Sequence, residues 1–152
     1  MTNDMLLQIA MGALGALGFA VWFNVRGLSL LVGTLGGALG WLVYLLTGGA
    51  YPNDLENYLY AAMAVTLFSE ILARVMKTPV TVLLVPSIIP LLPGGSLYYT
   101  MAFAIAGDMA AFSSRGAYTL SIAGMIALGI MTMMMIMRLY ASMRHRGAPG
   151  GR

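Results

Sequence analysis

Two acidic side chains stand inside stretches of the chain that are otherwise apolar. Glu70 lies toward the end of an apolar run that finishes around residue 76, and Asp108 lies toward the end of another. If these stretches cross a membrane, ionisable groups in them are costly and usually face a bundle interior or a water-filled cavity. Such groups can carry protons, so Glu70 and Asp108 are candidates for coupling proton movement to a conformational change or for organising a site.

Each of these acids has a basic residue nearby on its helix. Arg74 follows Glu70 by one helical turn, so the two side chains face the same side and can pair, which makes Arg74 a further candidate for proton coupling or for organising the site. Arg115 follows Asp108 by about two turns. Simpler interpretations stay open. Arg74 and Lys77 can reach lipid headgroups as interfacial anchors, and Asp108 can be an outer-interface residue near its helix end.

The stretch PSIIPLLPGGSLYYT, residues 86–100, is the most informative for a binding site. Its three prolines stop regular helix within an apolar region, and the glycine pair that follows permits a tight turn. Ser96 is placed to cap a new helix, whose first N–H groups would be unpaired and electropositive. Transporters hold anionic substrate groups at such half-helix starts. The residues expected in the substrate site or transport path are Pro86, Pro90, Pro93, Gly94, Gly95, Ser96, Tyr98 and Tyr99.

A proline-kinked helix with no binding role is the alternative for this stretch. Under that interpretation the prolines bend a continuous span, and the tyrosines need not face a cavity.

Small residues recur every four positions in the first two apolar runs. They are Gly12, Ala16 and Ala20 in the first run, and Gly33 with Gly37 and Gly36 with Gly40 in the second. In lipid this spacing lets helix backbones approach closely. Packing within the chain is the simpler interpretation and docking onto another protein is the alternative. Both place these faces against protein.

We expect no metal site and no cofactor. Thioethers bind Cu(I), but consecutive methionines point around a whole helix, and no His or Cys joins the methionine cluster. An apolar filling role suits these side chains better. His145 lies in the basic C-terminal segment, and the chain has no cysteine. The cluster comprises Met131, Met133, Met134, Met135 and Met137.

The composition indicates a chain whose solvent is hydrocarbon. Of its 152 residues, 60% are hydrophobic and 9% are charged. Soluble domains are about 25% charged, and one this short cannot bury so much apolar side chain. The basic residues flank the apolar runs, whereas a nucleic-acid binder would spread them over a folded face. The composition therefore argues against a soluble enzyme, a disordered chain and a nucleic-acid partner, and makes the lipid bilayer the first partner.

These features predict an all-α integral membrane protein of about five transmembrane helices, each needing about 20 mainly apolar residues. The fourth is discontinuous, with a short helix near 80–91, a Pro/Gly break at 92–95 and a longer helix from residue 96 to about 112. Residues 114–116 are expected to turn. The expected spans are 5–23, 28–47, 58–76, 80–112 and 117–140, forming one domain over 1–140 before a basic cytoplasmic tail at 141–152.

Orientation follows from the basic residues, which favour the cytoplasmic side. Arg26, Arg74, Lys77 and the C-terminal arginines would be cytoplasmic, and the loop at 48–57, whose charges are all acidic, would be outside. The N-terminus is then outside and the C-terminus in the cytoplasm.

Three segments resemble a known family. They are SEILARVMKTPVTVLLVPSIIPLLPGGSLYYTM at 69–101, WFNVRGL at 22–28 and GALGWLVY at 37–44. The chain is similar to the threonine/serine exporter (ThrE-like) family, specifically to its small YjjB-type membrane subunit. The resemblance runs from the first helix to about residue 115, and the proline and PGG segment is its specific part.

The resemblance implies export of threonine, serine or small dicarboxylates across the bacterial plasma (inner) membrane, powered by the proton gradient. It also implies a larger YjjP-type partner subunit with five spans and a cytoplasmic domain. Because five spans need further helices to enclose a path, a homo-oligomer also stays open. The motif residues that carry over by position are Ser69, Glu70, Arg74, Pro86, Pro90, Pro93, Gly94, Gly95 and Tyr98.

The expected function is therefore a membrane subunit of a secondary transporter that exports small polar metabolites. A structural or regulatory membrane subunit with no substrate path of its own is the alternative. We expect no enzyme, because no nucleophile and base, and no metal cluster, can be assembled from one histidine and scattered acids.

Overall fold

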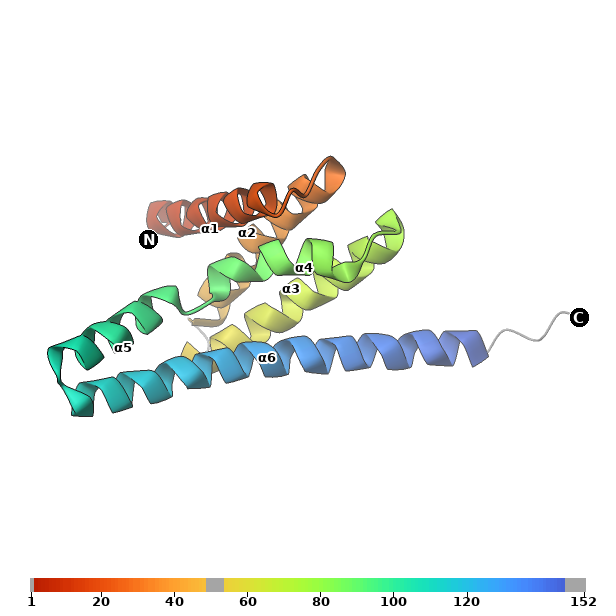
Figure 1. Ribbon diagram of the computed structural model, residues 1–152. Coiled ribbons are helices and arrows are strands. Elements are labelled where there is room, and N and C mark those ends of the chain that lie inside the picture. The colour runs from red at the N-terminus through yellow and green to blue at the C-terminus, as the bar shows by residue number, and fades with distance from the viewer. Residues whose placement is uncertain (1, 49–53, 147–152) are drawn as a thin grey trace, which may run out of the picture.

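The computed structural model describes residues 2–48 and 54–146, and every regular element in these ranges is a helix. The order along the chain follows the colour gradient of Figure 1. The elements are α1 (Thr2–Trp22), α2 (Leu28–Gly48), α3 (Asp54–Met76), α4 (Val80–Ile88), the 3-10 helix η1 (Ile89–Leu91), α5 (Gly94–Ala106) and α6 (Met109–Arg146).

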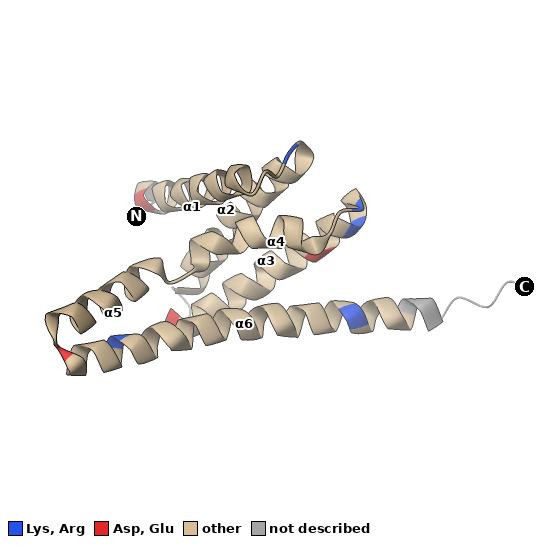
Figure 2. Cartoon of the chain, in the orientation of Figure 1, with Lys and Arg blue, Asp and Glu red and all other residues tan. Residues whose placement is uncertain are grey.

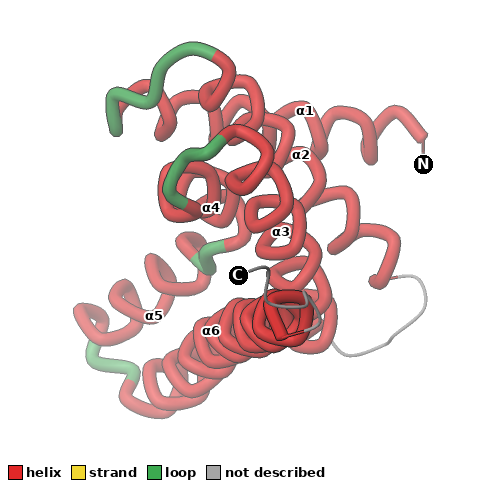
Figure 3. The backbone as a smooth tube through the Cα atoms, turned by 90° about the vertical axis from the view of Figure 1, so that its right-hand side faces the viewer, coloured by secondary structure: helices red, strands yellow, loops and turns green. Residues whose placement is uncertain are grey.

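The helices form a bundle in which α2 packs against α1, α3 and α4, while α6 runs alongside α3 (Figures 1 and 3). Four of them, α1, α2, α3 and α6, are long and apolar enough to cross a membrane. The segments Val80–Leu91 and Gly94–Ala106 pass the same criterion together and meet at a bend of 55°. The prediction of an all-α membrane protein with a discontinuous fourth span is confirmed.

Small residues hold the first three helices close together. Ala16 and Ala20 of α1 are fully buried. A Cβ atom added at Gly37 of α2 would overlap Ala16, and one added at Gly40 would lie 2.8 Å from Val65 Cγ2 of α3. Helices in lipid associate through close backbone contacts of this kind, because burying apolar surface does not favour helix association when the solvent is also apolar. The packing interpretation of these small residues is confirmed within the chain.

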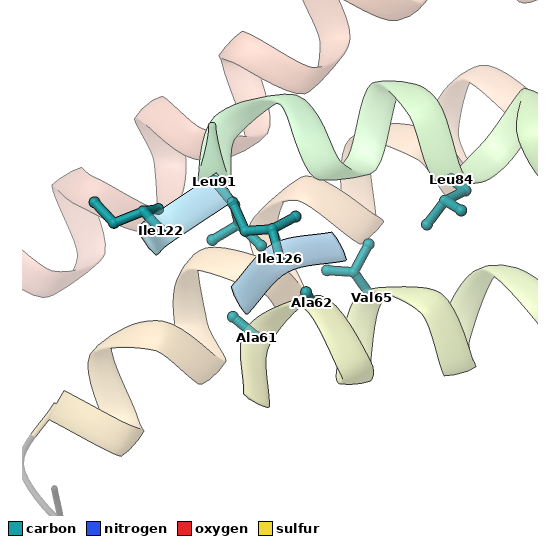
Figure 4. Close-up of a cluster of buried hydrophobic side chains, with 7 residues drawn as sticks. All are labelled: Ala61, Ala62, Val65, Leu84, Leu91, Ile122 and Ile126. Carbon is teal, nitrogen blue, oxygen red and sulfur yellow. The ribbon is translucent and has the colours of Figure 1, made fainter. Parts of the chain in front are cut away.

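One buried cluster joins α3, α4, η1 and α6, as Figure 4 shows. Leu91, the last residue of η1, is 1% exposed and packs with Ile122 and Ile126 of α6 and with Ala61 and Ala62 of α3. The end of η1 is therefore anchored in the core, immediately before the chain changes direction.

The turn expected at residues 114–116 is wrong, because those residues lie inside α6. The chain turns at Gly107, which has φ +77 and follows the last residue of α5. The amides of Gly107 and Asp108 donate to the carbonyls of Ala104 and Phe103, at 3.2 and 3.1 Å, which is the Schellman ending of a helix. Glycine adopts this left-handed conformation without steric cost.

The ends of two other spans also differ from expectation. α3 begins at Asp54 rather than Tyr58, and Asp54 and Glu56 occupy its first turn, where negative charge is favoured by the helix dipole. α6 continues to Arg146, so residues 141–146 of the predicted tail are helical. The rest of that tail, 147–152, and loop residues 49–53 lie outside the described residues.

Candidate functional site

The α4–η1 segment docks on the glycine face of α2 in a matched register. A Cβ atom added at Gly33 would lie 3.1 Å from Pro86 Cγ, and one added at Gly37 would lie 3.4 Å from Pro90 Cγ. Because both pairs are four residues apart, each proline ring fits one gap in the glycine stripe. Pro86 is buried and Pro90 is partly buried. These two prolines therefore fix the segment against α2.

Ser87 strengthens the same contact between the two helices. Its side chain is 1% exposed, and its Oγ lies 3.0 Å from the carbonyl oxygen of Gly33 and 2.7 Å from that of Leu83. A Cβ atom at Gly36 would overlap this hydroxyl. The bond to Gly33 joins residues 54 positions apart, which no local pattern could have predicted.

Leu92 and Pro93 form the α4–α5 break between η1 and α5. Leu92 is extended, with ψ 137°, and Pro93 has φ −77° and ψ 55°. The amide of Gly94 donates to the carbonyl of Leu92 at 2.8 Å, which closes an inverse γ-turn around Pro93. Proline suits the central position because its ring fixes φ near this value.

The break opens about half-way along α2. Pro90 and Leu91, the residues just before it, contact Gly37 and Gly40, which flank the midpoint of that helix. Beyond the break, α5 leaves α2 and packs on α6. Gly94 and Gly95 are exposed, and a Cβ atom at either would meet nothing within 4 Å. The start of α5 is therefore open on its outer side.

The first turn of α5 presents backbone amides at this opening. The amide of Leu97 donates to the carbonyl of Pro93 at 2.9 Å. Helix geometry offers no intrahelical carbonyl to the amides of Gly95 and Ser96 in the same turn. Amides in this position carry the positive end of the helix dipole, so they are suited to a carboxylate or another small anion.

The expectation that Ser96 caps α5 is wrong, because α5 already begins at Gly94 with Pro93 as its cap residue and no side-chain cap bond. Ser96 instead belongs to a cluster of three hydroxyl groups between α5 and α6. Its Oγ lies 2.7 Å from Thr119 Oγ1, which lies 3.3 Å from Thr100 Oγ1. Thr100 and Thr119 are 5% and 6% exposed. The sequence analysis missed both threonines.

A groove of about 440 Å³ runs beside these hydroxyl groups, between α5 and α6. Its walls are mostly apolar, with Leu97 and Thr100 on one side and Phe112, Gly116 and Thr119 among those on the other. Tyr98 and Tyr99 lie on the surface of α5, 70% and 54% exposed, with their rings in edge contact at 5.5 Å.

Glu70 and Arg74 form the predicted ion pair. Arg74 Nη2 lies 3.2 Å from Glu70 Oε2, and the Glu70 side chain is 12% exposed. The same Nη2 donates to the main-chain oxygen of Met137 at 3.3 Å, which ties α3 to α6. Glu70 lies eight residues beyond Ala62, which belongs to the same buried cluster as Leu91 at the end of η1. About 12 Å therefore separates Glu70 from Ala62 along α3.

Asp108 lies in the connection between α5 and α6, and not inside a helix. Its Oδ1 accepts a hydrogen bond from the amide of Ala111 at 3.0 Å, so it caps the start of α6. The side chain is exposed. The outer-interface interpretation of Asp108 describes this position better than that of an acid within an apolar helix.

The structure thus brings together some of the predicted residues and separates others. Pro93, Gly94, Gly95 and Ser96 meet at the break, with Thr100 and Thr119 beside them. Glu70 and Arg74 lie near the end of α3 that leads to α4, and Asp108 lies in the α5–α6 connection. Figure 1 shows these two connections at opposite ends of the bundle. Among the side chains described, those of residues 3–48 and 54–143, no three His, Asp or Glu groups converge as metal ligands would.

Comparison with known proteins gives a family. The model of the family described as Threonine/Serine exporter, ThrE, matches residues 8–136. This range includes α2, the break, the hydroxyl cluster and Glu70. The chain belongs to the threonine/serine exporter family. No curated protein and no solved structure matches it.

Membership agrees with the architecture. A threonine/serine exporter moves its substrate across a membrane, and this chain is a multi-pass membrane protein with a helix interrupted inside its bundle. In membrane proteins, irregular backbone at this depth is tolerated where it is buried in protein or lines a cavity. In this chain the side of the break that faces α2 is buried, and the opposite side is open.

Proposed function

We propose that this chain is a membrane subunit of a secondary transporter that exports threonine, serine or small carboxylates. The observation that carries the proposal is the break half-way along α2, within the segment that matches the exporter family. Discontinuous helices whose ends point at the substrate are a recurring device of secondary transporters.

The start of α5 is proposed to hold the carboxylate of the substrate. The amides of Gly95 and Ser96 offer hydrogen-bond donors at the positive end of the helix, and Gly94 and Gly95 leave room for a ligand to reach them. The hydroxyl groups of Ser96, Thr100 and Thr119 lie beside this turn and supply polar partners for the rest of a small hydrophilic molecule.

Glu70 is proposed as the group that couples proton movement to transport. It is mostly buried and paired with Arg74, which also holds α6 through Met137. Protonation of Glu70 would remove the negative partner of Arg74 and weaken the link between α3 and α6. Asp108 is exposed and acts as a helix cap, which suits it to serve as a matched control.

The path is proposed to be completed by other helices. The groove between α5 and α6 is open along its length, and Tyr98 and Tyr99 face outward beside it. A larger YjjP-type membrane subunit, or further copies of this chain, would enclose the path. We place the assembly in the bacterial inner membrane, with the N-terminus of this chain outside and its C-terminus in the cytoplasm.

Flux measurements in proteoliposomes test the proposal. The chain and its partner are reconstituted, and export of labelled threonine is followed with and without an imposed proton gradient. Glu70→Gln should abolish the gradient-driven component while exchange of substrate across the membrane continues. Asp108→Asn keeps the cap, since Asn accepts the same hydrogen bond, and should leave gradient-driven flux unchanged. Unchanged gradient-driven flux in Glu70→Gln would remove its coupling role.

The alternative is a structural or regulatory subunit with no substrate path of its own. Gly94→Val and Gly95→Val separate the two functions, because an added side chain meets open space within this chain yet blocks the amides of α5. Loss of flux with intact assembly of the two subunits supports a substrate site. Loss of assembly instead supports a scaffold.

A further inference from the structure

A groove lies at the corner where the connection between α1 and α2 meets α4. Its volume is about 370 Å³, and it is mostly apolar. On α4 the groove runs along Val82, Val85 and Pro86. Val85 and Pro86 come three and four residues after Val82, so the three side chains share one face of the helix. The groove therefore runs lengthwise, from the first turn of α4 toward the break. The full lining is Phe23, Asn24, Val25, Thr81, Val82, Val85 and Pro86.

A basic side chain adjoins this groove. Arg26 is exposed and follows three consecutive lining residues, Phe23, Asn24 and Val25. Its Nε donates to Asn24 Oδ1 at 3.0 Å. The bond orients the guanidinium group and leaves the four N–H groups of its two Nη atoms for other acceptors. Lys77, also exposed, lies in the connection that leads into α4, four residues before Thr81.

Aromatic side chains mark the same end of the molecule as an interface with lipid headgroups. Phe19, Trp22 and Phe23 are 37%, 77% and 51% exposed, and the Trp22 ring lies 5.9 and 6.0 Å from the other two. Exposed tryptophans at a helix end are typical of the headgroup level of a bilayer. Figure 2 shows basic residues at both connections of this end, α1–α2 and α3–α4, and Figure 3 shows that the two connections lie on the same side.

We propose that this corner, formed by the Phe23–Arg26 turn and the first half of α4, is a binding site for an anionic phospholipid. The phosphate lies on the Nη groups of Arg26, with Lys77 adding attraction, and one acyl chain fills the groove along Val82 and Val85. Neither the family match nor the transport site assigns this corner a ligand. The charge beside the groove selects an anionic headgroup over a zwitterionic one, because basic groups near an anionic leaflet are attracted additively.

Tryptophan quenching tests the proposal, because the chain has two tryptophans and Trp22 adjoins the site. In a Trp41→Phe background, the full chain is reconstituted in phosphatidylcholine vesicles with increasing amounts of lipid that carries brominated acyl chains. Brominated phosphatidylglycerol should quench Trp22 with an affinity about 25-fold above that of brominated phosphatidylcholine, because two basic residues contribute. Each basic residue at the site should contribute about fivefold to this preference.

Arg26→Gln and Lys77→Gln should each lower the preference for phosphatidylglycerol by about fivefold. Arg138→Gln makes the same charge change on α6, where Arg138 borders a different groove, and should leave the preference unchanged. Val85→Phe, which fills the groove, should weaken quenching by both lipids while Arg26 is kept. Each of these variants alters an exposed side chain, so all of them should fold. Circular dichroism checks that they do.

Three results would overturn the proposal. The first is equal quenching by the two lipids, which would mean that only ordinary boundary lipid reaches Trp22. The second is an equal loss of preference in Arg138→Gln, which would assign the effect to net charge and not to this corner. The third is loss of the preference when inorganic phosphate is added to match the lipid headgroups, which would point to a soluble anion as the ligand.

Discussion

Single glycines of α2 decide how closely the interrupted segment can approach the bundle. Gly36 lies under the buried hydroxyl of Ser87, and Gly33 and Gly37 each receive a proline ring. A methyl group at Gly36 would have to displace Ser87, whose hydroxyl also bonds the Gly33 carbonyl. The contact between Gly36 and Ser87 has no room for an added methyl group, and packed interiors tolerate added volume poorly.

We therefore expect Gly36→Ala to destabilise the protein by about 1–3 kcal/mol, the usual cost of overpacking a close contact. Gly18→Ala is the matched control, because a Cβ atom there meets nothing within 4 Å. Since alanine favours a helix more than glycine does, this variant should be no less stable than the parent chain. Unfolding by detergent, followed by circular dichroism, measures both. Equal stability of the two variants would show that α4 does not pack on α2 as described.

The hydroxyl cluster makes a second prediction for single residues. Thr119→Val keeps the shape of the side chain and removes the partner of Ser96 and Thr100. Hydrogen bonds between helices in membranes contribute about 0.6 kcal/mol on average, so the loss of stability should be small. If these hydroxyl groups contact substrate, the KM for export should rise while the amount of assembled protein stays the same. An unchanged KM would limit the cluster to packing.

At the scale of the helices, Asp108 acts as the cap that starts α6. Asp108→Ala removes the acceptor of the Ala111 amide and should lower stability by about 1 kcal/mol, whereas Asp108→Asn should retain most of it. Thermal unfolding in detergent would show a lower Tm for Asp108→Ala than for Asp108→Asn. Equal Tm values for the two variants would contradict the capping role.

The sequence predicts those features of the helices that depend on local spacing. Prolines followed by two glycines indicated the break, and the four-residue interval between Glu70 and Arg74 indicated their ion pair. The four-residue repeat of α2 glycines indicated close packing. Each of these signals involves residues within one or two helical turns, where backbone geometry alone fixes which side chains meet.

Local spacing does not predict contacts between residues that are far apart in the sequence. Ser96 was expected to be a cap, but it pairs with Thr119, 23 positions away, once α5 folds back on α6. The polar stretch at 114–116 suggested a turn, yet it continues α6 because Gly107 and Asp108 had already ended one helix and started the next. Polar stretches indicate candidate turns, and the chain turns at the candidate that has a glycine in the left-handed conformation, Gly107.

For the whole molecule, charge is unevenly divided between the two ends of the bundle. Arg26 and Lys77 lie in the α1–α2 and α3–α4 connections at one end. Asp54 begins α3 and Asp108 precedes α6 toward the other end, where Figure 2 also shows one basic residue in the first turns of α6. α6 is 38 residues long, about 57 Å at 1.5 Å per residue, whereas about 20 residues cross a bilayer. The helix must therefore tilt or extend beyond the hydrocarbon region at its ends.

This division predicts the orientation of the chain, with the acidic end outside. The chain has no cysteine, so single cysteines can be introduced directly. Asn3→Cys should react with a membrane-impermeant maleimide in intact cells, and Met143→Cys should react only after the membrane is opened. Both positions are exposed. The reverse pattern would invert the proposed topology.

Water at the α4–α5 break is the central requirement of the transport account, and the reactivity of a cysteine at Gly95 measures it most directly. Thiols react as thiolates, which form in water and not in hydrocarbon. In membranes that hold the chain and its partner, Gly95→Cys should react with a hydrophilic methanethiosulfonate at least about tenfold faster than Leu35→Cys, on the exposed face near the middle of α2. Threonine should slow the reaction at Gly95→Cys alone. Equal, slow reaction at both positions, with no protection by threonine, would place the break against lipid and contradict the account.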